Sequence, residues 1–382
     1  MNRSVILLFS LALVFSCKNV SEDPGNFLSQ FRNPSLEYST APFWVWNDQV
    51  TKEIIDRQLK EFKKEKMHEV FVHPRPGLIT EYLSEEWFEL FRYSVEQGKK
   101  LGIRIWMYDE NSFPSGFGGG HVAAEMPESY RSGDDISMRR GDEIDETKEV
   151  VAYFKLEDQK FTKIDKVPEN PDDSFLAFEI TYRENTGWHG GFSYVDLIMP
   201  GVTEKFIDVT MKGYEDVAGE DFGKQVPGIF TDEPNISPGT KGNIRFSPVL
   251  FKEFEKRWGY QLQNHLPSLF LEIGDFKKVR YHYYKLLLNL FIERWSKPWF
   301  EYTEAKNLSW TGHYWEHGWP NPHHGGDNMA MYAWHQIPAI DMLFNTFDER
   351  PDQFGNVRAV KELSSVANQL DNIQGDEDVF GS

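Results

Sequence analysis

Cysteine and positive charge are both scarce in this sequence, and each shortage excludes a class of protein. The 382 residues contain one cysteine, Cys17, so neither an intramolecular disulfide nor a cysteine-based zinc site can form. Lysine and arginine number 41 against 60 aspartate and glutamate residues, for a formal net charge of −19. Because binding nucleic acid through phosphate neutralisation needs a basic face, we expect no nucleic-acid partner.

Phosphate-binding loops, internal repeats and low-complexity tracts are also missing. The segment Gly116–Gly120 lacks the Gly-Lys-Ser/Thr ending of a phosphate loop, which disfavours a nucleotide- or phosphate-dependent enzyme. We interpret its glycines as allowing the backbone to approach a ligand closely. Aromatic residues, by contrast, are abundant. The 12 Trp, 16 Tyr and 30 Phe make up 15% of the chain, a content that excludes a disordered protein.

The N-terminus predicts a secreted, membrane-anchored protein. Arg3 precedes an apolar stretch, Val5–Phe15, that is too short to span a bilayer as a stable helix. Because Val14-Phe15-Ser16-Cys17 resembles a bacterial lipobox, we expect residues 1–16 to be a lipoprotein signal peptide and Cys17 to be lipidated. Residues 17–40 then form a polar tether, and the protein is an outer-membrane lipoprotein facing the periplasm or the cell surface. An ordinary signal peptide with a chance cysteine is the alternative.

From residue 41 onward the sequence alternates between strand and helix patterns. This order favours parallel strands with right-handed crossovers, so we expect an α/β fold, a (β/α)₈ TIM-type barrel over residues 41–382. The barrel is expected to be truncated near its seventh strand, and a further candidate strand is placed around 371–380. The expected strands are 41–47, 69–73, 103–108, 194–197, 228–231, 308–313 and 339–343.

Residues 132–193 interrupt this order of strands and helices. They are charged, rich in turn residues, and contain runs of alternating polar and apolar residues that are typical of strands. They predict a small antiparallel β insertion on a βα loop. Among the helices, Thr51 and Ser84 have the residue type and position of N-caps, and Pro298 is expected to kink a long helix over 276–306. Two further helices are expected near 202–217 and over 356–370.

Polar and aromatic side chains follow the expected strands at their carboxyl ends. In a barrel these ends form one rim, so residues distant in sequence converge there. Carboxylates supply general acid and base or nucleophile, and tryptophan faces stack on sugar rings, so the pattern favours sugar chemistry. The candidate substrate-binding residues are Trp46, Asn47, His73, Arg75, Asp109, Glu110, Asp232, His313, Glu316 and Asp341.

Each of these residues also has a purely structural interpretation. Asp232 and Glu233 precede Pro234 and can be an acidic pair that starts a helix. His73 can be a hydrogen-bonded core histidine. Asp109 and Glu110 can simply pair with Arg75.

Short motifs along the chain resemble the large bacterial glycoside hydrolases related to family 106, the α-L-rhamnosidase type. The resemblance implies a catalytic (β/α)₈ barrel, hydrolysis of glycosidic bonds in plant-type polysaccharides, and frequent calcium dependence, although no DxDxDG-type calcium loop is present. The motifs are Phe43–Asn47, His73–Leu78, Tyr108–Glu110 with Phe113–Gly116, Tyr194–Leu197, Phe230–Pro234, Thr311–His313 and Ile337–Asp341.

The catalytic carboxylates follow from this resemblance. Glu233 is expected to be the general acid, with its pKa raised by Asp109, Glu110 and the apolar wall of Trp310. The family's second glutamate belongs to a motif that corresponds here to 375–382, where Asp378 occupies its place and Glu377 is one residue away.

The resemblance also leaves two alternatives to an active enzyme. The sequence looks like the front of a longer protein, so a downstream-encoded remainder is an expected partner besides the carbohydrate and the lipid anchor. The alternatives are a catalytically inactive glycan-binding lipoprotein and a non-functional fragment.

Overall fold

The computed structural model describes residues 24–32, 39–316, 325–342 and 353–370. The chain divides into two units, and helix α2 (Pro24–Arg32) belongs to a different unit from residues 41–375, which are described below. Within the described ranges, no helix has the length and apolar character needed to cross a membrane. Cys17, the signal peptide, Glu377 and Asp378 lie outside the described residues.

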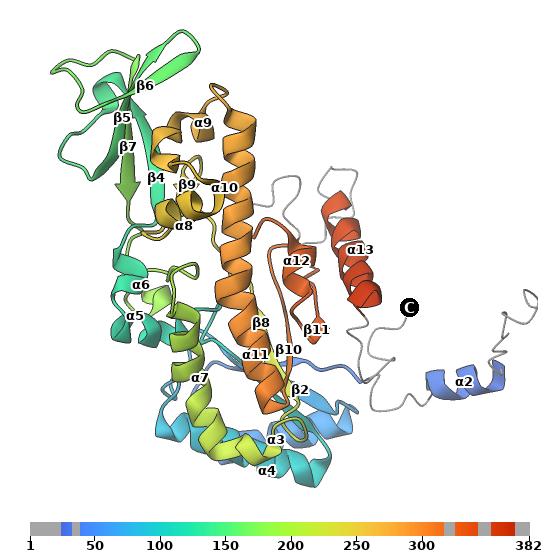
Figure 1. Ribbon diagram of the computed structural model, residues 1–382. Helices are drawn as coiled ribbons and strands as arrows, with labels where there is room; N and C mark the ends of the chain where they lie inside the picture. The colour runs from blue at the N-terminus through green and yellow to red at the C-terminus, as the bar shows by residue number, and fades with distance from the viewer. Residues whose placement is uncertain (1–23, 33–38, 317–324, 343–352, 371–382) are drawn as a thin grey trace, which may run out of the picture. The chain divides into compact units, whose positions relative to one another are not determined.

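Six parallel strands form the sheet on which the candidate site is built (Figure 1). Their order across the sheet is β1-β2-β3-β8-β10-β11, so β1 and β11 are the two edges among the described residues. Closure of the sheet into an eight-stranded barrel stays a prediction. The strands are β1 (Phe43–Trp46), β2 (Glu69–Pro74), β3 (Arg104–Tyr108), β8 (Gly228–Asp232), β10 (Ser309–His313) and β11 (Ile337–Pro338).

Alternation along the strands gives the parallel sheet two apolar faces. In β1, Trp44 and Trp46 are buried in the large core cluster, while Phe43 and Val45 are exposed on the opposite side. Helices pack against the first face, among them α3 (Lys52–Lys64), α4 (Glu85–Leu101) and α7 (Val202–Ala218). The second face has its own cluster, formed by Phe71, Trp106, Tyr108 and Phe230. Tyr108, on this second face, donates a hydrogen bond to Asp232 at the carboxyl end of β8, where the candidate site lies.

The helix boundaries follow the sequence signals. The side chains of Thr51 and Ser84 accept hydrogen bonds from the first turns of α3 and α4, which confirms both predicted N-caps. Gly102 ends α4 in the left-handed conformation, with φ of 69°. The remaining helices are α5 (His121–Glu125), α6 (Glu128–Arg131), α8 (Leu250–Trp258), α9 (Leu266–Phe270), α10 (Phe276–Phe291), α11 (Lys297–Lys306), α12 (Asn328–Tyr332) and α13 (Gln353–Leu370).

Helices α10 and α11 form one long, nearly continuous helix, drawn in orange in Figure 1. They are joined by a π-helical segment, Ile292–Ser296, directly before Lys297 and Pro298. Since proline donates no N–H to the preceding turn, the irregular segment lies where the sequence predicts a kink.

A five-stranded antiparallel sheet accounts for most of 132–193. Its order is β6-β5-β7-β4-β9, and its last member comes from a later part of the chain. The pairing of β4 with β7 runs from Asp135 opposite Thr181 to Arg140 opposite Leu176. The strands are β4 (Asp135–Arg140), β5 (Val150–Glu157), β6 (Lys160–Ile164), β7 (Phe175–Thr181) and β9 (Ile244–Arg245).

Two predicted strands are corrected by the structure. Residues 194–197 form no strand, because β8 takes the position beside β3. Their backbone instead crosses to other loops, with the Asp196 N–H donating to the Ser129 carbonyl over 2.7 Å. The strand expected over 339–343 is displaced to Ile337–Pro338, and within 339–342 the chain has already left the sheet.

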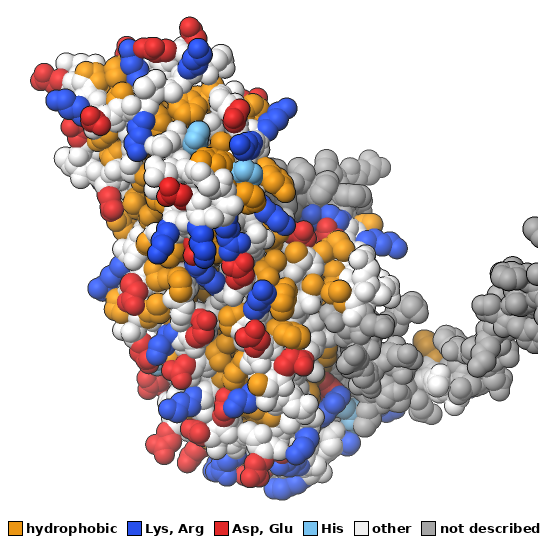
Figure 2. All heavy atoms as spheres, viewed as in Figure 1, with side chains coloured by type: hydrophobic (Ala, Val, Ile, Leu, Met, Phe, Trp, Pro, Cys, Tyr) orange, Lys and Arg blue, Asp and Glu red, His pale blue; other side chains and the backbone are white. Residues whose placement is uncertain are grey.

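On the face shown in Figure 2, acidic and basic side chains are interspersed and form no single-sign patch. The excess negative charge of the chain therefore gives no sign of a docking surface on this face.

Candidate active site

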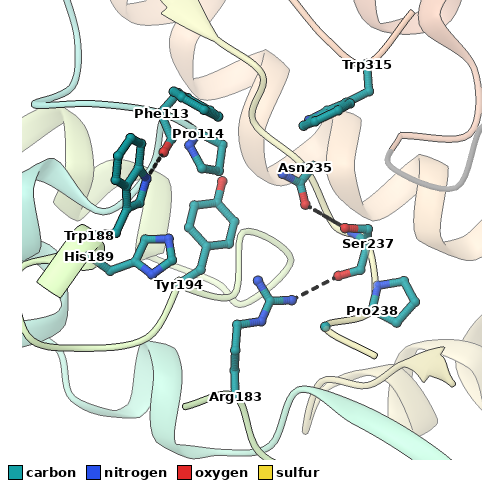
Figure 3. Close-up of a pocket in the computed structure, with 11 residues that line it drawn as sticks. Phe113, Pro114, Arg183, Trp188, His189, Tyr194, Asn235, Ser237, Pro238 and Trp315 are labelled. Carbon is teal, nitrogen blue, oxygen red and sulfur yellow. Dashed lines mark hydrogen bonds between the residues drawn. The ribbon is translucent and has the colours of Figure 1, made fainter. Parts of the chain in front are cut away.

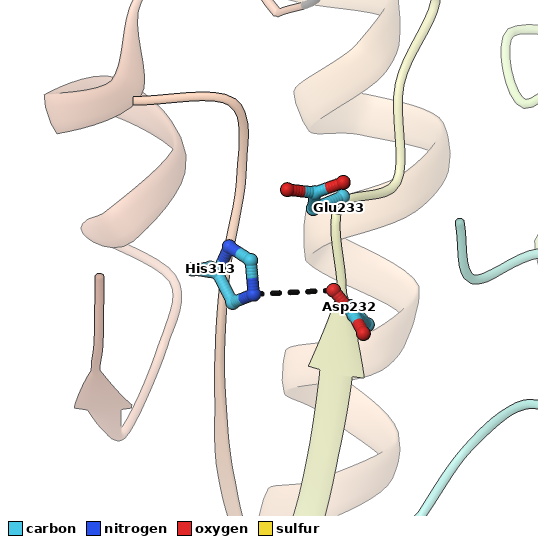
Figure 4. A group of neighbouring side chains, drawn as sticks. All are labelled: Asp232, Glu233 and His313. Atoms are coloured by element: carbon cyan, nitrogen blue, oxygen red, sulfur yellow. Dashed lines mark ion pairs between the residues drawn. The ribbon is translucent and has the colours of Figure 1, made fainter. Parts of the chain in front are cut away.

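Asp232, Glu233 and His313 meet where β8 and β10 end (Figure 4). The parallel register places His313 opposite Asp232, and the His313 Nε2 atom lies 3.1 Å from Asp232 Oδ1. On its other side, the ring's Nδ1 atom lies 3.1 Å from the Tyr314 carbonyl oxygen. Asp232 also accepts a hydrogen bond from the Tyr108 hydroxyl. The Asp232 carboxylate is thus held by two buried partners.

Glu233 occupies an unusual backbone conformation. Its φ of 49° lies in the left-handed region, which costs a residue other than glycine about 1–3 kcal/mol. The Glu233 N–H donates to the His313 carbonyl over 3.1 Å, and Pro234 follows with a restricted φ. Its carboxylate has no hydrogen-bond partner among the described residues, although the residue is only 5% exposed. Strain and a nearly buried carboxylate without a partner among the described residues make Glu233 a candidate functional residue.

Burial raises the pKa of Glu233 to about 8, and the charges of Asp232, Asp341 and Glu316 add to the effect while His313 opposes it. These neighbours replace Asp109 and Glu110, which the sequence had suggested for this task. The side chain therefore carries its proton at neutral pH. A general acid needs this property.

His313 is a charged partner at neutral pH. Burial disfavours its charged form, but the hydrogen bond to Asp232 and the charges of Glu316 and Glu233 raise its pKa to about 10. Burial raises the pKa of Asp232, but the hydrogen bond and the charge of His313 outweigh burial. The pKa of Asp232 therefore lies below its usual value. Asp232 and His313 thus form a buried ion pair beside the protonated Glu233.

Glu316 is fully buried behind His313. Its Oε1 atom lies 3.8 Å from His313 Nδ1, and its carboxylate accepts the Tyr332 hydroxyl over 3.0 Å and the Asp341 N–H. Burial raises the pKa of Glu316. Glu316 and Asp341, both expected at the rim, are therefore brought to Glu233.

Asp109 and Glu110 are fully buried, and each of their carboxylate oxygens accepts a hydrogen bond from their own loop or from β8. Asp109 accepts hydroxyl hydrogen bonds from Ser115 over 2.5 Å and Thr231 over 2.8 Å. The Glu110 carboxylate accepts four backbone N–H groups, at 3.3, 3.0, 2.7 and 2.6 Å, from residues 116–119. The glycine-rich loop thus binds the chain's own carboxylate, and we correct its interpretation as a ligand loop. Neither acid pairs with Arg75.

His73 is buried at the end of β2, stacked on Phe43 at a ring-centroid distance of 4.7 Å and edge-on to Tyr108 at 3.9 Å. Neither ring nitrogen has a hydrogen-bond partner in the described part of the chain. Burial and the charge of Arg75 lower its pKa to about 3, so the ring is neutral. His73 is therefore a core histidine without the hydrogen bond that its purely structural interpretation requires, among the described residues.

The two residues expected at the end of β1 lie apart from this group. Trp46 is buried on the helix side of the sheet, with its ring centroid 5.0 Å from that of Trp87. Asn47 is exposed. Trp310, suggested as an apolar wall for Glu233, is fully buried against Trp299 and His335.

A pocket of about 370 Å³ with aromatic walls lies along the loop that follows Glu233 (Figure 3). Asn235, one of its lining residues, donates its side-chain N–H to the Glu233 backbone carbonyl over 3.3 Å, which places the pocket beside the backbone of Glu233. The indole N–H of Trp188 donates to the Phe113 carbonyl over 2.5 Å. The lining residues are Phe113, Pro114, Arg183, Trp188, His189, Tyr194, Asn235, Ser237, Pro238, Gly239 and Trp315.

Sequence reasoning missed several of these residues. Trp188 and Arg183 come from the loop after β7, which was treated only as part of an insertion. One signal was available, since Trp188 and His189 lie between Gly187 and Gly190, as aromatic side chains on a glycine-flanked loop often do at binding sites. Tyr108, which holds Asp232, offered no signal beyond being the last residue of a buried strand.

Asp232, Glu233 and His313 have side chains that can bind metals, and one ligand atom of each lies within 4.8 Å of the others. Calcium takes six to eight oxygen ligands. The two ring nitrogens of His313 already face Asp232 and the Tyr314 carbonyl, and its raised pKa makes the ring a cation. As they stand, these residues do not fit the calcium ion that the family resemblance implies, and we derive no step through a metal.

The fold is similar to that of a rhamnosidase from Novosphingobium sp. PP1Y, with a TM-score of 0.56 and 13% identity over 89% of this chain and 51% of that one. The present chain thus spans about half the length of that enzyme. No protein-family model matches the sequence, and no curated protein matches it either.

A second solved structure is a GH20 exo-β-N-acetylglucosaminidase from Vibrio harveyi in complex with N-acetylglucosamine. Its TM-score is 0.33 and its identity 11%, over 74% of this chain and 36% of that one. A TM-score this low supports no inference about the present fold.

Proposed function

We propose that this protein is a glycoside hydrolase, with α-L-rhamnosides as the first substrates to test. The observation that carries the proposal is Glu233: a nearly buried carboxylic acid with its pKa raised to about 8, in a strained conformation, beside an aromatic pocket. The likeness to the rhamnosidase supports the choice of substrate.

In the proposed reaction Glu233 donates its proton to the glycosidic oxygen as the bond to the sugar breaks. The Glu233 backbone is held by the His313 carbonyl, and the opposite charges of Asp232 and His313 cancel each other beside the acid. Aromatic walls such as Trp188 and Trp315 stack against the sugar ring. A second carboxylate serves as base or nucleophile, and Glu377 and Asp378 remain our candidates for it.

The test uses Glu233→Gln on two rhamnosides that differ in their leaving group. An alkyl or sugar leaving group needs the proton, so we expect kcat/KM to fall about 100-fold or more. A 4-nitrophenol group departs without a proton, so its hydrolysis should fall much less. Equal losses on both substrates would contradict the role of Glu233 as the acid. A wild-type protein inactive on all glycosides would contradict the enzyme itself.

A second candidate function is glycan binding without hydrolysis. The aromatic pocket favours it, since its Trp188 and Trp315 walls can stack on a sugar ring without help from a second carboxylate. Saturable binding of a rhamnose-containing oligosaccharide, measured by calorimetry with no release of sugar, would support this candidate. Turnover would reject it.

We also propose that the protein is attached to the membrane through a lipid on Cys17, on the strength of the lipobox resemblance. Replacing Cys17 with Ser should move the protein from the detergent-soluble fraction to the aqueous one. An unchanged distribution would reject the anchor.

A further inference from the structure

Arg75 is a half-buried cation that has no acidic partner among the described residues. Its backbone N–H donates to the Trp46 carbonyl over 3.0 Å, which holds the loop after β2 against β1. Its guanidinium carbon lies 5.3 Å from the centroid of the Phe113 ring. Across the residues that the structure describes, this guanidinium makes neither an ion pair nor a side-chain hydrogen bond.

The arginines in the neighbouring loops are paired. Arg245 is held by Asp134 and Asp196, and Arg183 lies 3.0 Å from Asp134. Pairing is the usual state of a buried or half-buried arginine, because the desolvated charge needs compensation. The lack of a partner at Arg75 therefore calls for an explanation.

Its position supplies one. Phe113 lines the pocket beside Glu233, so the guanidinium stacked on Phe113 lies at the border of that pocket. Stacking keeps the planar group oriented while its N–H donors stay available. A guanidinium fork matches the two oxygens of a carboxylate or of a sulfate.

The acids near Glu233 do not oppose an anion as strongly as their number suggests. Asp232 is paired with His313, and burial raises the pKa values of Glu233 and Glu316. Asp109 is enclosed by hydroxyl groups, and burial raises its pKa as well. Arg75 thus keeps a charge that its surroundings leave uncompensated.

We propose that Arg75 forms an anion subsite at the border of the pocket, and that the glycan bound here carries a uronate carboxylate or a sulfate ester. This inference rests on the proposed function, which places a sugar in the pocket. It adds that the neighbouring sugar of the glycan carries a negative charge. Neutral glycans lack the group that the guanidinium binds.

The experiment measures binding by calorimetry or by NMR titration, without turnover. The probes are D-glucuronate, D-galactose 6-sulfate, and the uncharged methyl ester of glucuronic acid. We expect at least one anion to bind about tenfold or more tightly than the ester, as charge-assisted hydrogen bonds allow. The preferred anion identifies the carboxylate or the sulfate as the source.

The variants are Arg75→Gln, Arg75→Lys and the matched control Arg57→Gln, which removes an exposed arginine on α3. Arg75→Gln should abolish the preference for the anion, Arg75→Lys should keep part of it, and Arg57→Gln should keep all of it. Equal binding of the anions and the ester by the wild type would overturn the subsite. So would a preference that survives Arg75→Gln. If Arg75→Gln does not fold, Arg75→Lys is the variant to measure. An unchanged preference for the anion in Arg75→Lys would contradict binding of the anion through the forked guanidinium group.

Failure of the subsite and failure of the proposed function are distinguishable. A protein that binds the anion through Arg75 but hydrolyses nothing contradicts only the hydrolase. A protein that hydrolyses rhamnosides but binds both probes equally contradicts only the subsite.

Discussion

Two neighbouring strands of the parallel sheet end in the same dipeptide, and the two copies have different fates. After β3, Asp109 and Glu110 are both fully buried, and every carboxylate oxygen has a partner. After β8, Asp232 is held in the same way, but the Glu233 carboxylate has no hydrogen-bond partner among the described residues. Equal residues at equal strand ends thus supply one structural acid and one candidate catalytic acid.

The difference comes from the residues that follow. After Glu110 the chain turns through glycines, and four backbone N–H groups converge on its carboxylate. After Glu233 comes Pro234, which has no N–H to offer, and the left-handed φ of Glu233 directs the chain away. The lesson is that an acidic residue at a strand end becomes reactive when its own loop leaves it unsatisfied.

The largest expected effect on activity comes from Glu233→Gln. On a substrate whose leaving group needs a proton, kcat should fall about 100-fold or more, because the amide has no proton to donate. At pH 5 its melting temperature should stay nearly unchanged, since the shape is kept and no hydrogen bond is lost. A residual activity above one tenth, measured with an alkyl rhamnoside, would reject the assignment.

The matching change at the other strand end is Glu110→Gln, and its effect should be on stability. A glutamine offers one acceptor oxygen where two now accept five backbone N–H groups, and its amide N–H groups face other donors. We expect the free energy of unfolding to fall by about 2 kcal/mol, from buried donors left without partners. Urea denaturation monitored by tryptophan fluorescence measures this loss. A stability equal to that of Glu233→Gln would erase the contrast between the two acids.

A smaller loss is expected for Asp232→Asn. The variant keeps an oxygen for the Tyr108 hydroxyl but removes the charge that raises the pKa of His313. We expect kcat/KM to fall about tenfold, as a misplaced partner would cause, rather than the full effect of losing the acid. NMR titration of the His313 ring should show its pKa lowered. A loss as large as that of Glu233→Gln would contradict a positioning role for Asp232.

The last expected effect is a pH dependence of stability. In the folded protein the pKa of Glu233 is about 8 and that of Glu110 about 7, both above the ordinary value of 4.5. The folded state therefore holds these protons more tightly than the unfolded state, so their contribution is present below pH 4.5 and is lost as the pH rises toward 8. Thermal unfolding should show a lower stability at pH 8 than at pH 5, and the decrease should be smaller in Glu233→Gln. An equal decrease would contradict the raised pKa.

Interpretation of the sequence succeeded where the signals are local. The caps at Thr51 and Ser84 depend on a few adjacent residues, and the structure confirms them. It failed at Tyr194–Leu197, where a β-prone run forms no strand because β3 pairs directly with β8. Pairing partners of parallel strands are separated by long crossovers, so no local pattern determines them.

The candidate site shows the same division. That Asp232, Glu233, His313 and Glu316 lie at strand ends follows from the alternation of strands and helices in the sequence. Which side of β1 carries Trp46 does not follow, because a strand with aromatic residues at every second position is compatible with either face inward.

The sequence by itself determined the elements and the chemistry available at their ends, since helix caps, glycine turns and apolar periodicity act over a few residues. Only the tertiary structure decided which acid is free. The glycine loop after β3 closes on Glu110, whereas Glu233 meets His313 and the aromatic pocket through residues far away in the chain. Burial and long-range charge set the pKa of a carboxylate, and neither exists until the strands are side by side.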